Sequence, residues 1–188
     1  MRRYFTRFAY FAGISGALFL LCLPWVERFG YDPDAIRAGE VWRLLTAHVT
    51  HLSANHAILN ALGFGLAGAV LLQVASPRQL LFCVAGTVAV IDLVFLIPAL
   101  QSDANFAGFS AILYGLAALA AVLLWVKRMS WGLLIASAVA AALVTDFLGW
   151  RSPGFEIATG THVVGVVCGI FLGVYLINSP RHSALRKS

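Results

Sequence analysis

The sequence predicts an all-α membrane protein with six membrane-spanning helices, and three observations lead to this fold class. Of the 188 residues, 61% are hydrophobic and only 11% are charged, whereas a soluble domain is about half apolar and a quarter charged. The apolar residues fall in six runs, each near the roughly 20 residues that a helix needs to cross a bilayer. Basic residues and tryptophans gather at the ends of these runs. A water-soluble enzyme, a disordered chain and a secreted disulfide scaffold are therefore excluded.

The six predicted spans form a single domain over residues 1–188. The first span follows a basic start and has no small-residue cleavage site after it, so we expect an uncleaved signal-anchor rather than a signal peptide. The segment 27–49 is too polar to cross the membrane and carries a motif of its own. In chain order the spans cover 8–26, 50–74, 79–98, 108–126, 131–149 and 161–178, with Trp25, Trp125, Trp131 and Trp150 at their ends.

The distribution of basic residues predicts that both termini are cytoplasmic, because Lys and Arg are enriched on that side. The inner segments then carry Arg2, Arg3, Arg7, Arg78, Lys127, Arg128, Arg181, Arg186 and Lys187, and the outer ones Arg28, Arg37, Arg43 and Arg151. The acids outside the spans fall on the outer side: Glu27, Asp32, Asp34, Glu40, Asp103 and Glu156. We interpret the net charge of +5 as a consequence of this topology and expect no nucleic-acid partner.

Five polar residues are predicted to lie at a similar depth in the bilayer. Counted at about 1.5 Å per residue from the inner end of each span, Asn60, Ser110, Asp146 and His162 lie roughly 22–24 Å from that end, and Asp92 about 20 Å. In a hydrocarbon core of about 30 Å this layer is some 6–10 Å below the outer surface. The coincidence indicates a polar site inside the membrane.

The two acids of this layer have two interpretations. A lone acid inside a span is costly unless it faces the interior of the bundle. We interpret Asp92 and Asp146 as protonated hydrogen-bond partners between helices. The alternative is a pair of proton relays in a small transporter, which leaves the serine and histidine motifs unexplained.

Ser110 is the candidate nucleophile. Gly108 precedes it by two residues and allows an unusual backbone turn at the mouth of the helix. The hydroxyl would then lie at a helix N-terminus, where free N–H groups and the helix dipole favour a developing negative charge. Tyr114, one turn further on, shares its face. The alternative interpretation of Ser110 is an ordinary N-cap serine.

His162 is the candidate general base. It opens the last span and shares a face with Gly165 and Gly169, whose spacing allows a neighbouring helix to approach closely. If that face packs on the helix that follows Gly108, the imidazole can take the proton of Ser110. The alternative is an interfacial histidine above a glycine-packed helix.

Three further histidines lie between the first loop and the second span. His56 and Asn60 are four residues apart on one helix face, and both can donate hydrogen bonds to an oxyanion. His48 and His51 could instead be metal ligands together with His56. No acidic or thiolate partner stands at a matching spacing, so we expect no metal and no cofactor.

These elements together resemble the rhomboid intramembrane serine proteases. The resemblance extends from Glu40 to Gly173, and the order and spacing of the motifs fit the family. The motifs are Glu40-x-Trp42-Arg43 followed by Thr46 and His51, then His56-x-x-x-Asn60, Gly108-x-Ser110, Tyr114-Gly115 and His162-x-x-Gly165-x-x-x-Gly169. One departure is Ala111, where many members of the family have glycine.

The resemblance implies a serine endopeptidase with a Ser110–His162 dyad that requires no acid. His56 and Asn60 would hold the oxyanion, and Tyr114 would pack against the His162 ring. Substrates would be transmembrane segments of other proteins, cut near their outer end within the lipid bilayer.

The resemblance also assigns the first outer loop a structural role. Trp42 and Arg43 would belong to a loop that lies partly in the outer leaflet, and the pairing of Glu40 with Arg43 would hold this loop in position. An inactive, rhomboid-like protein that binds client helices is the alternative function. Inactive relatives typically lack the nucleophile or the base, and both are present here.

A narrower resemblance is to the rhombosortase branch of the family. The compact six-span form and the stretch from Tyr31 to Thr46 are similar to that branch, although a histidine would be expected there in place of Tyr114. This resemblance implies a multi-pass protein of the bacterial inner membrane that processes surface proteins with a Gly-Gly C-terminal membrane tail.

Overall fold

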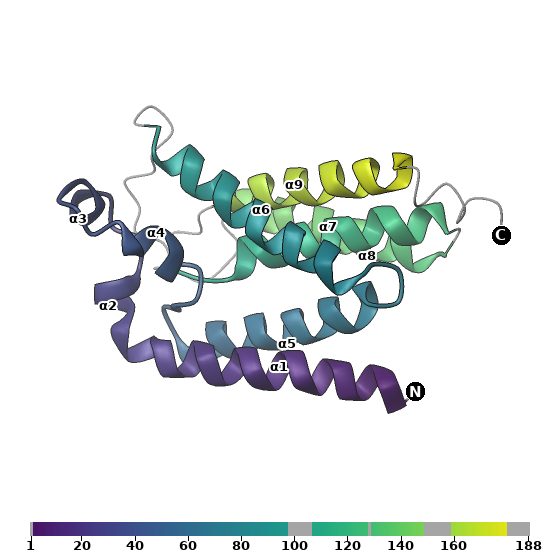
Figure 1. Cartoon of the computed structure of the whole chain (residues 1–188), viewed down its shortest axis with the longest axis horizontal. Coiled ribbons are helices and arrows are strands. Elements are labelled where there is room, and N and C mark those ends of the chain that lie inside the picture. Colours follow the sequence, from purple (N-terminus) through teal and green to yellow (C-terminus); the bar gives the residue numbers. More distant parts are fainter. Residues whose placement is uncertain (1, 98–106, 128, 149–158, 180–188) are drawn as a thin grey trace.

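The computed structural model describes residues 2–97, 107–127, 129–148 and 159–179; within these ranges the regular elements are all helices and there is no strand. Long helices lie side by side, and three short helices gather at one end of the bundle (Figure 1). Several predicted features lie outside the described residues: Trp150, Arg128, Arg151, Arg181, Arg186, Lys187, Asp103, Glu156 and the predicted ends of the third and fifth spans at 98 and 149.

The first span is longer than predicted. Helix α1 (Arg2–Cys22) continues through the 3-10 turn η1 (Leu23–Trp25) into α2 (Val26–Phe29). It packs along α5 (Ala54–Leu71), where Gly65 and Gly68 leave no room for a Cβ against Phe8, Ala12 and Phe11. Arg7 donates to the carbonyl of Leu72 at 3.0 Å. A basic side chain thus satisfies a free carbonyl at the C-terminus of α5.

The outer segment between the first two spans folds into short helices. These are α3 (Pro33–Arg37) and α4 (Trp42–Thr46). The carboxylate of Asp32 accepts the backbone N–H groups of Asp34 and Ala35, both at 3.0 Å, so it caps the start of α3. As predicted, no helix of this segment is long enough to cross the membrane.

Local capping sets the helix starts that the hydrophobic pattern missed by a few residues. Helix α5 begins at Ala54 instead of 50 because Ser53 accepts the N–H of His56. Helix α6 (Pro77–Phe95) begins two residues before the predicted 79 because Ser76 and Gln79 form a capping box. Apolar runs report where a chain is buried in lipid, whereas these starts depend on individual side-chain hydrogen bonds.

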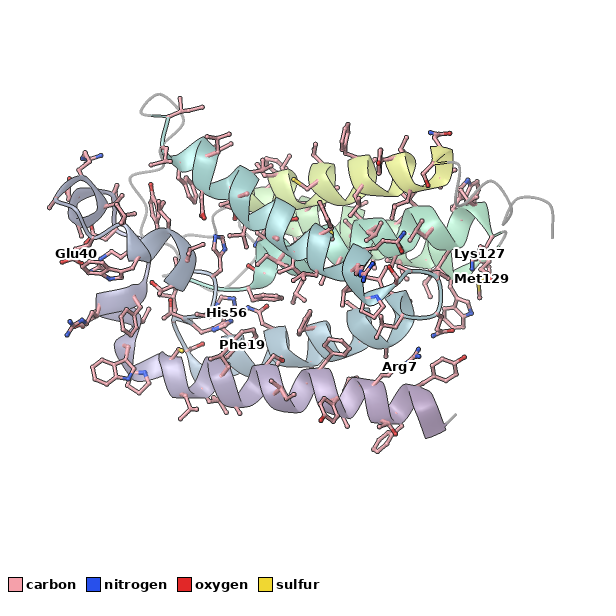
Figure 2. The ribbon with its side chains drawn as sticks, in the orientation of Figure 1. Arg7, Phe19, Glu40, His56, Lys127 and Met129 are labelled. Carbon is pink, nitrogen blue, oxygen red and sulfur yellow. The ribbon has the colours of Figure 1, made fainter. Side chains whose placement is uncertain are left out.

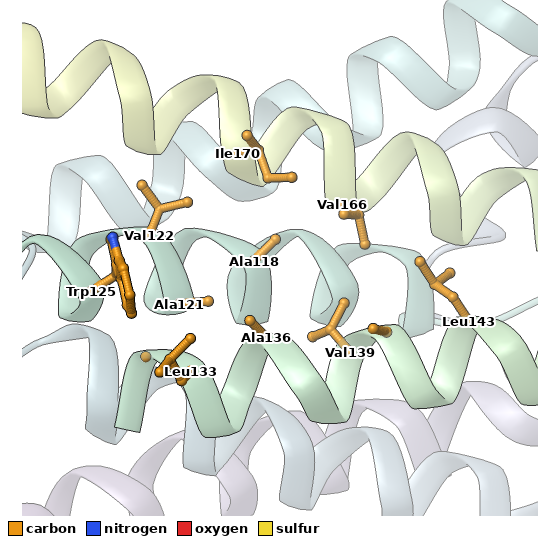
Figure 3. Close-up of a pocket in the computed structure, with 12 residues that line it drawn as sticks. Ala118, Ala121, Val122, Trp125, Leu133, Ala136, Val139, Leu143, Val166 and Ile170 are labelled. Atoms are coloured by element: carbon orange, nitrogen blue, oxygen red, sulfur yellow. The ribbon is translucent and has the colours of Figure 1, made fainter. Parts of the chain in front are cut away.

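Helix α7 (Ser110–Val126) is the centre of the bundle and is almost entirely buried. Its most extensive neighbour is α9 (Thr159–Asn178). Helix α8 (Trp131–Phe147) covers one side of α7 and buries only Gly132 and Asp146 among its residues. Between these two points lies an apolar pocket of about 410 Å³, lined by α7, α8 and α9 (Figure 3). Helix α8 is therefore attached near its two ends.

The all-helical membrane bundle predicted from the sequence is confirmed. Four stretches are long and apolar enough to cross a membrane, and α7 and α8 are shorter apolar helices of 17 residues each, the lower limit for a span. The start of α1 and the end of α9 lie at the same end of the bundle (Figure 1). The count of six spans and the cytoplasmic location of the termini stay predictions.

Candidate active site

Ser110 is held in place by the glycine loop before it. Gly108 has a φ of +146°, a conformation that glycine adopts without the strain of a side chain. Its N–H donates to the carbonyl of Ala47 at 2.9 Å, which ties the loop to the end of α4. Ser110 is the first residue of α7. Its hydroxyl therefore lies at a helix N-terminus, as the sequence predicted.

The side chains of Ser110 and His162 meet between α7 and α9. Ser110 Oγ and His162 Nε2 are 2.8 Å apart, within the range for a nucleophile and its general base. The two helices approach through glycine. A Cβ added at Gly165 would overlap the carbonyl oxygen of Ala111, and one added at Gly169 would overlap that of Gly115. The two helices therefore pack closely through Gly165 and Gly169.

Tyr114 covers one face of the histidine. Its ring is stacked on that of His162, with centroids 4.3 Å apart and an interplanar angle of 21°. This contact is the one that the sequence resemblance implied. His162 is 4% exposed. The stacked Tyr114 ring restricts the imidazole on one face, and hydrogen bonds restrict it at its nitrogens.

Asp146 of α8 is a member of this cluster that the sequence analysis did not place there. Its Oδ2 lies 2.8 Å from His162 Nδ1 and accepts a hydrogen bond from the Tyr114 hydroxyl at 2.7 Å. The sequence analysis predicted that Asp146 is a protonated hydrogen-bond partner between helices, but it did not predict which residues it contacts. The signal was its depth, equal to that of Ser110 and His162; which face of α8 it occupies could not be read from that helix's uniformly apolar sequence.

His56 and Asn60 lie beside the glycine loop. A Cβ at Gly108 would lie 2.6 Å from Cε1 of His56, which is too close, and 3.6 Å from Nδ2 of Asn60, which is an ordinary contact. Glycine therefore leaves room for the His56 ring next to the nucleophile's loop. Asn60 Nδ2 is 2.8 Å from Nε2 of His51, whose Nδ1 is 3.2 Å from the carbonyl of Val49. Because a carbonyl can only accept, His51 carries its proton on Nδ1 and accepts from Asn60.

An aromatic side chain of α1, Phe19, packs against this part of the site. The ring of Phe19, from α1, lies 4.5 Å from that of His51 and 5.3 Å from that of Phe109. Figure 2 shows Phe19 and His56 toward the end of the bundle that also carries Glu40. The first helix thus buttresses both the serine loop and the histidine that holds Asn60.

The second acid of the predicted layer belongs to a different pair. Asp92 Oδ1 lies 3.0 Å from His48 Nε2, which joins α6 to the segment after α4. His48 and His51 therefore have different hydrogen-bond partners. Across the ranges that the structure describes, no group of three or more His, Cys, Asp or Glu residues could hold a metal ion.

Arg43 organises the first outer loop. Its guanidinium is buried and pairs with Glu40 at 2.6 Å, and it donates to the carbonyls of Glu27 and Gly30, both at 2.9 Å. The predicted Glu40–Arg43 pair is present. Trp42 beside it is 44% exposed, on the outside of the loop.

The family comparison agrees with this architecture. A family model described as the Rhomboid domain matches residues 38–179, from the first outer loop to the end of α9. The chain belongs to the rhomboid family. Rhomboids are multi-pass membrane proteins, generally serine intramembrane proteases that act on transmembrane substrates within the bilayer. No curated protein matches the chain. In this rhomboid the matched region contains every residue that the sequence analysis assigned to the site.

Proposed function

We propose that this rhomboid is an active serine endopeptidase, with Ser110 as nucleophile and His162 as general base. The observation that carries the proposal is the 2.8 Å contact between Ser110 Oγ and His162 Nε2. As Oγ attacks the scissile carbonyl, its proton moves to Nε2, which then protonates the leaving amine. Water, activated by the same histidine, hydrolyses the acyl-enzyme and restores the free serine.

His56 and Asn60 would stabilise the oxyanion together with backbone N–H groups at the start of α7. Both side chains border Gly108. The hydrogen bond from Asn60 Nδ2 to His51 uses one of the two amide N–H groups and fixes the orientation of the amide, so the second N–H would donate to the oxyanion. Donors that are already oriented before the reaction stabilise the developing charge without reorganisation. Trp42, Arg43 and Glu40 would shape the outer loop and take no part in the chemistry.

A client-binding protein and a transporter would each use these residues differently. An inactive client-binding protein has no use for a serine hydrogen-bonded to a buried histidine, so the enzyme is favoured. A proton-relay transporter would need its two acids on one path. Asp92 instead pairs with His48 in the segment after α4, and Asp146 pairs with His162 on α9.

The test of the proposed function is labelling by a fluorophosphonate probe, which reacts only with an activated serine. We expect the purified protein in detergent to be labelled, with the adduct on the peptide that contains Ser110. Ser110→Ala should not be labelled. Absence of labelling in a folded wild-type sample would contradict the protease and leave the client-binding alternative.

The substrates are proposed to be membrane proteins with a Gly-Gly segment near the outer end of their membrane tail, in the bacterial inner membrane. The similarity of residues 31–46 to the rhombosortase branch supports this class. There is also a physical reason. Carbonyls of a transmembrane helix are occupied by its own hydrogen bonds, so the helix must unwind locally before a bond can be cut.

A reporter span with Gly-Gly near its outer end is expected to be cleaved roughly tenfold or more faster than the same span with Leu-Leu. Each glycine disfavours the helix by about 1 kcal/mol, which lowers the free energy of unwinding. Cleavage of both reporters should disappear in Ser110→Ala. Equal cleavage of the two reporters by the wild type would retain the protease and reject this substrate class.

A further inference from the structure

Asp146 is placed where a carboxylate can act on the catalytic histidine. Its side chain is fully buried, and that of His162 is 5% exposed. The residues of α8 are otherwise exposed or half-buried, apart from Gly132 at the far end. The one polar residue that this helix buries therefore contacts the base of the proposed site, at 2.8 Å.

The hydrogen bonds around Asp146 select one tautomer of His162. When Asp146 is ionised its carboxylate can only accept hydrogen bonds, so Oδ2 accepts from the Tyr114 hydroxyl and from Nδ1 of His162. Nδ1 must then carry a proton. In the neutral ring this leaves the lone pair on Nε2, which faces Ser110 Oγ at 2.8 Å. A general base for Ser110 requires this tautomer.

We propose that Asp146 is a positioning residue that completes a Ser110–His162–Asp146 relay, with the Tyr114 hydroxyl orienting its carboxylate. This inference rests on the proposed function. It replaces the two-residue site that the family resemblance implied, and it takes Asp146 as ionised instead of protonated as the sequence analysis interpreted it. When Ser110 Oγ bonds to the scissile carbonyl, its proton passes to Nε2. The Nδ1 proton stays on the imidazolium, whose positive charge the Asp146 carboxylate stabilises. The carboxylate itself neither gains nor loses a proton.

A second histidine–carboxylate pair in the same protein provides a matched comparison. His48 and Asp92 are 3.0 Å apart, and the histidine is likewise buried. This pair joins α6 to the first loop, and no hydrogen bond seen within the described residues links it to Ser110. The effect on packing of losing a carboxylate that pairs with a buried histidine should therefore appear at both positions, whereas an effect on the nucleophile should appear only at Asp146.

The first experiment compares Asp146→Asn with Asp92→Asn in reporter cleavage and in the rate of fluorophosphonate labelling, each per folded molecule. In soluble serine proteases the same Asp→Asn change lowers kcat by about 10⁴ because the histidine adopts the wrong tautomer. We expect Asp146→Asn to lower kcat and the labelling rate by about 10²-fold or more, with KM within a few-fold of wild type. Asp92→Asn should keep both rates within a few-fold.

The outcomes separate this inference from the proposed function. If the wild type is not labelled, the protease itself is contradicted. If the wild type is labelled and Asp146→Asn reacts at the wild-type rate, Asp146 only attaches α8 to the bundle and the inference is overturned. Equal losses in both Asn variants would overturn it in the same way.

A second experiment uses the wild-type protein and does not depend on the folding of an Asp146 variant. Nitrogen NMR of ¹⁵N-histidine-labelled protein at neutral pH distinguishes the two tautomers of each ring. The signals of His162 are those that change when Ser110 is modified by the fluorophosphonate and that vanish in His162→Ala. We expect a proton on Nδ1 and none on Nε2. A His162 ring with its proton on Nε2 would overturn the inference.

Discussion

Replacement of His162 by alanine is expected to lower kcat for reporter cleavage by at least about 10⁴-fold. Ser110 Oγ would lose the only group that the described structure places within 2.8 Å to take its proton. In a soluble serine protease, removal of the histidine lowers kcat by about 10⁶. The measurement is single-turnover cleavage of a Gly-Gly reporter in detergent, with enzyme in excess.

The control for this change is another buried histidine. His48→Gln keeps a hydrogen-bonding side chain opposite Asp92, outside the proposed site, and should cleave at a rate within a few-fold of wild type. Circular dichroism would verify that both variants remain helical. A His162→Ala protein that cleaves within tenfold of wild type would reject His162 as the base.

Replacement of Gly165 or Gly169 by alanine is expected to lower activity by about 10²-fold or more and to destabilise the fold. A Cβ at either position would overlap a backbone carbonyl of α7, at Ala111 or at Gly115. A rotamer change cannot move a backbone atom, so the two helices must separate. A displacement of about 1 Å between reacting groups is enough for such a loss in rate, and overpacking typically destabilises by about 1–3 kcal/mol.

A third glycine in a long helix provides the matched control. Gly86 lies on the exposed side of α6, and a Cβ there would have no heavy atom within 4 Å. Gly86→Ala should therefore leave the labelling rate of Ser110 and the thermal unfolding midpoint close to wild type. Full activity in Gly165→Ala and Gly169→Ala would show that the close approach of α7 and α9 is not what brings Ser110 to His162.

Most of the fold followed from the apolar runs, because a chain in lipid must satisfy its backbone polar groups within each span. The helix boundaries were less accurate. The start of α5 depends on Ser53 and that of α6 on a capping box at Ser76, and neither leaves a mark on hydrophobicity. Residues 50–53, which include His51, were predicted as the start of the second span. They are not helical because they lead into the Ser53 cap of α5.

In the candidate site, relations within one helix were easier to predict than relations between helices. Helix spacing places Ser110 and Tyr114 on one face, and His162, Gly165 and Gly169 on another. These are relations within a single helix, which sequence spacing can predict. That the two faces meet is a relation between helices, which the glycines predicted because close packing in a membrane requires small residues.

The sequence by itself therefore determined the helical membrane bundle and the residues that carry the proposed chemistry, because hydrophobic runs and short motifs are local properties of the chain. Only the tertiary structure decided how the two intramembrane acids are used. Asp92 and Asp146 have the same side chain at nearly the same predicted depth, yet one contacts His48 and the other His162. The difference arises from the rotation of α6 and α8 about their own axes. That rotation is set by packing against neighbouring helices, so no pattern within either helix specifies it.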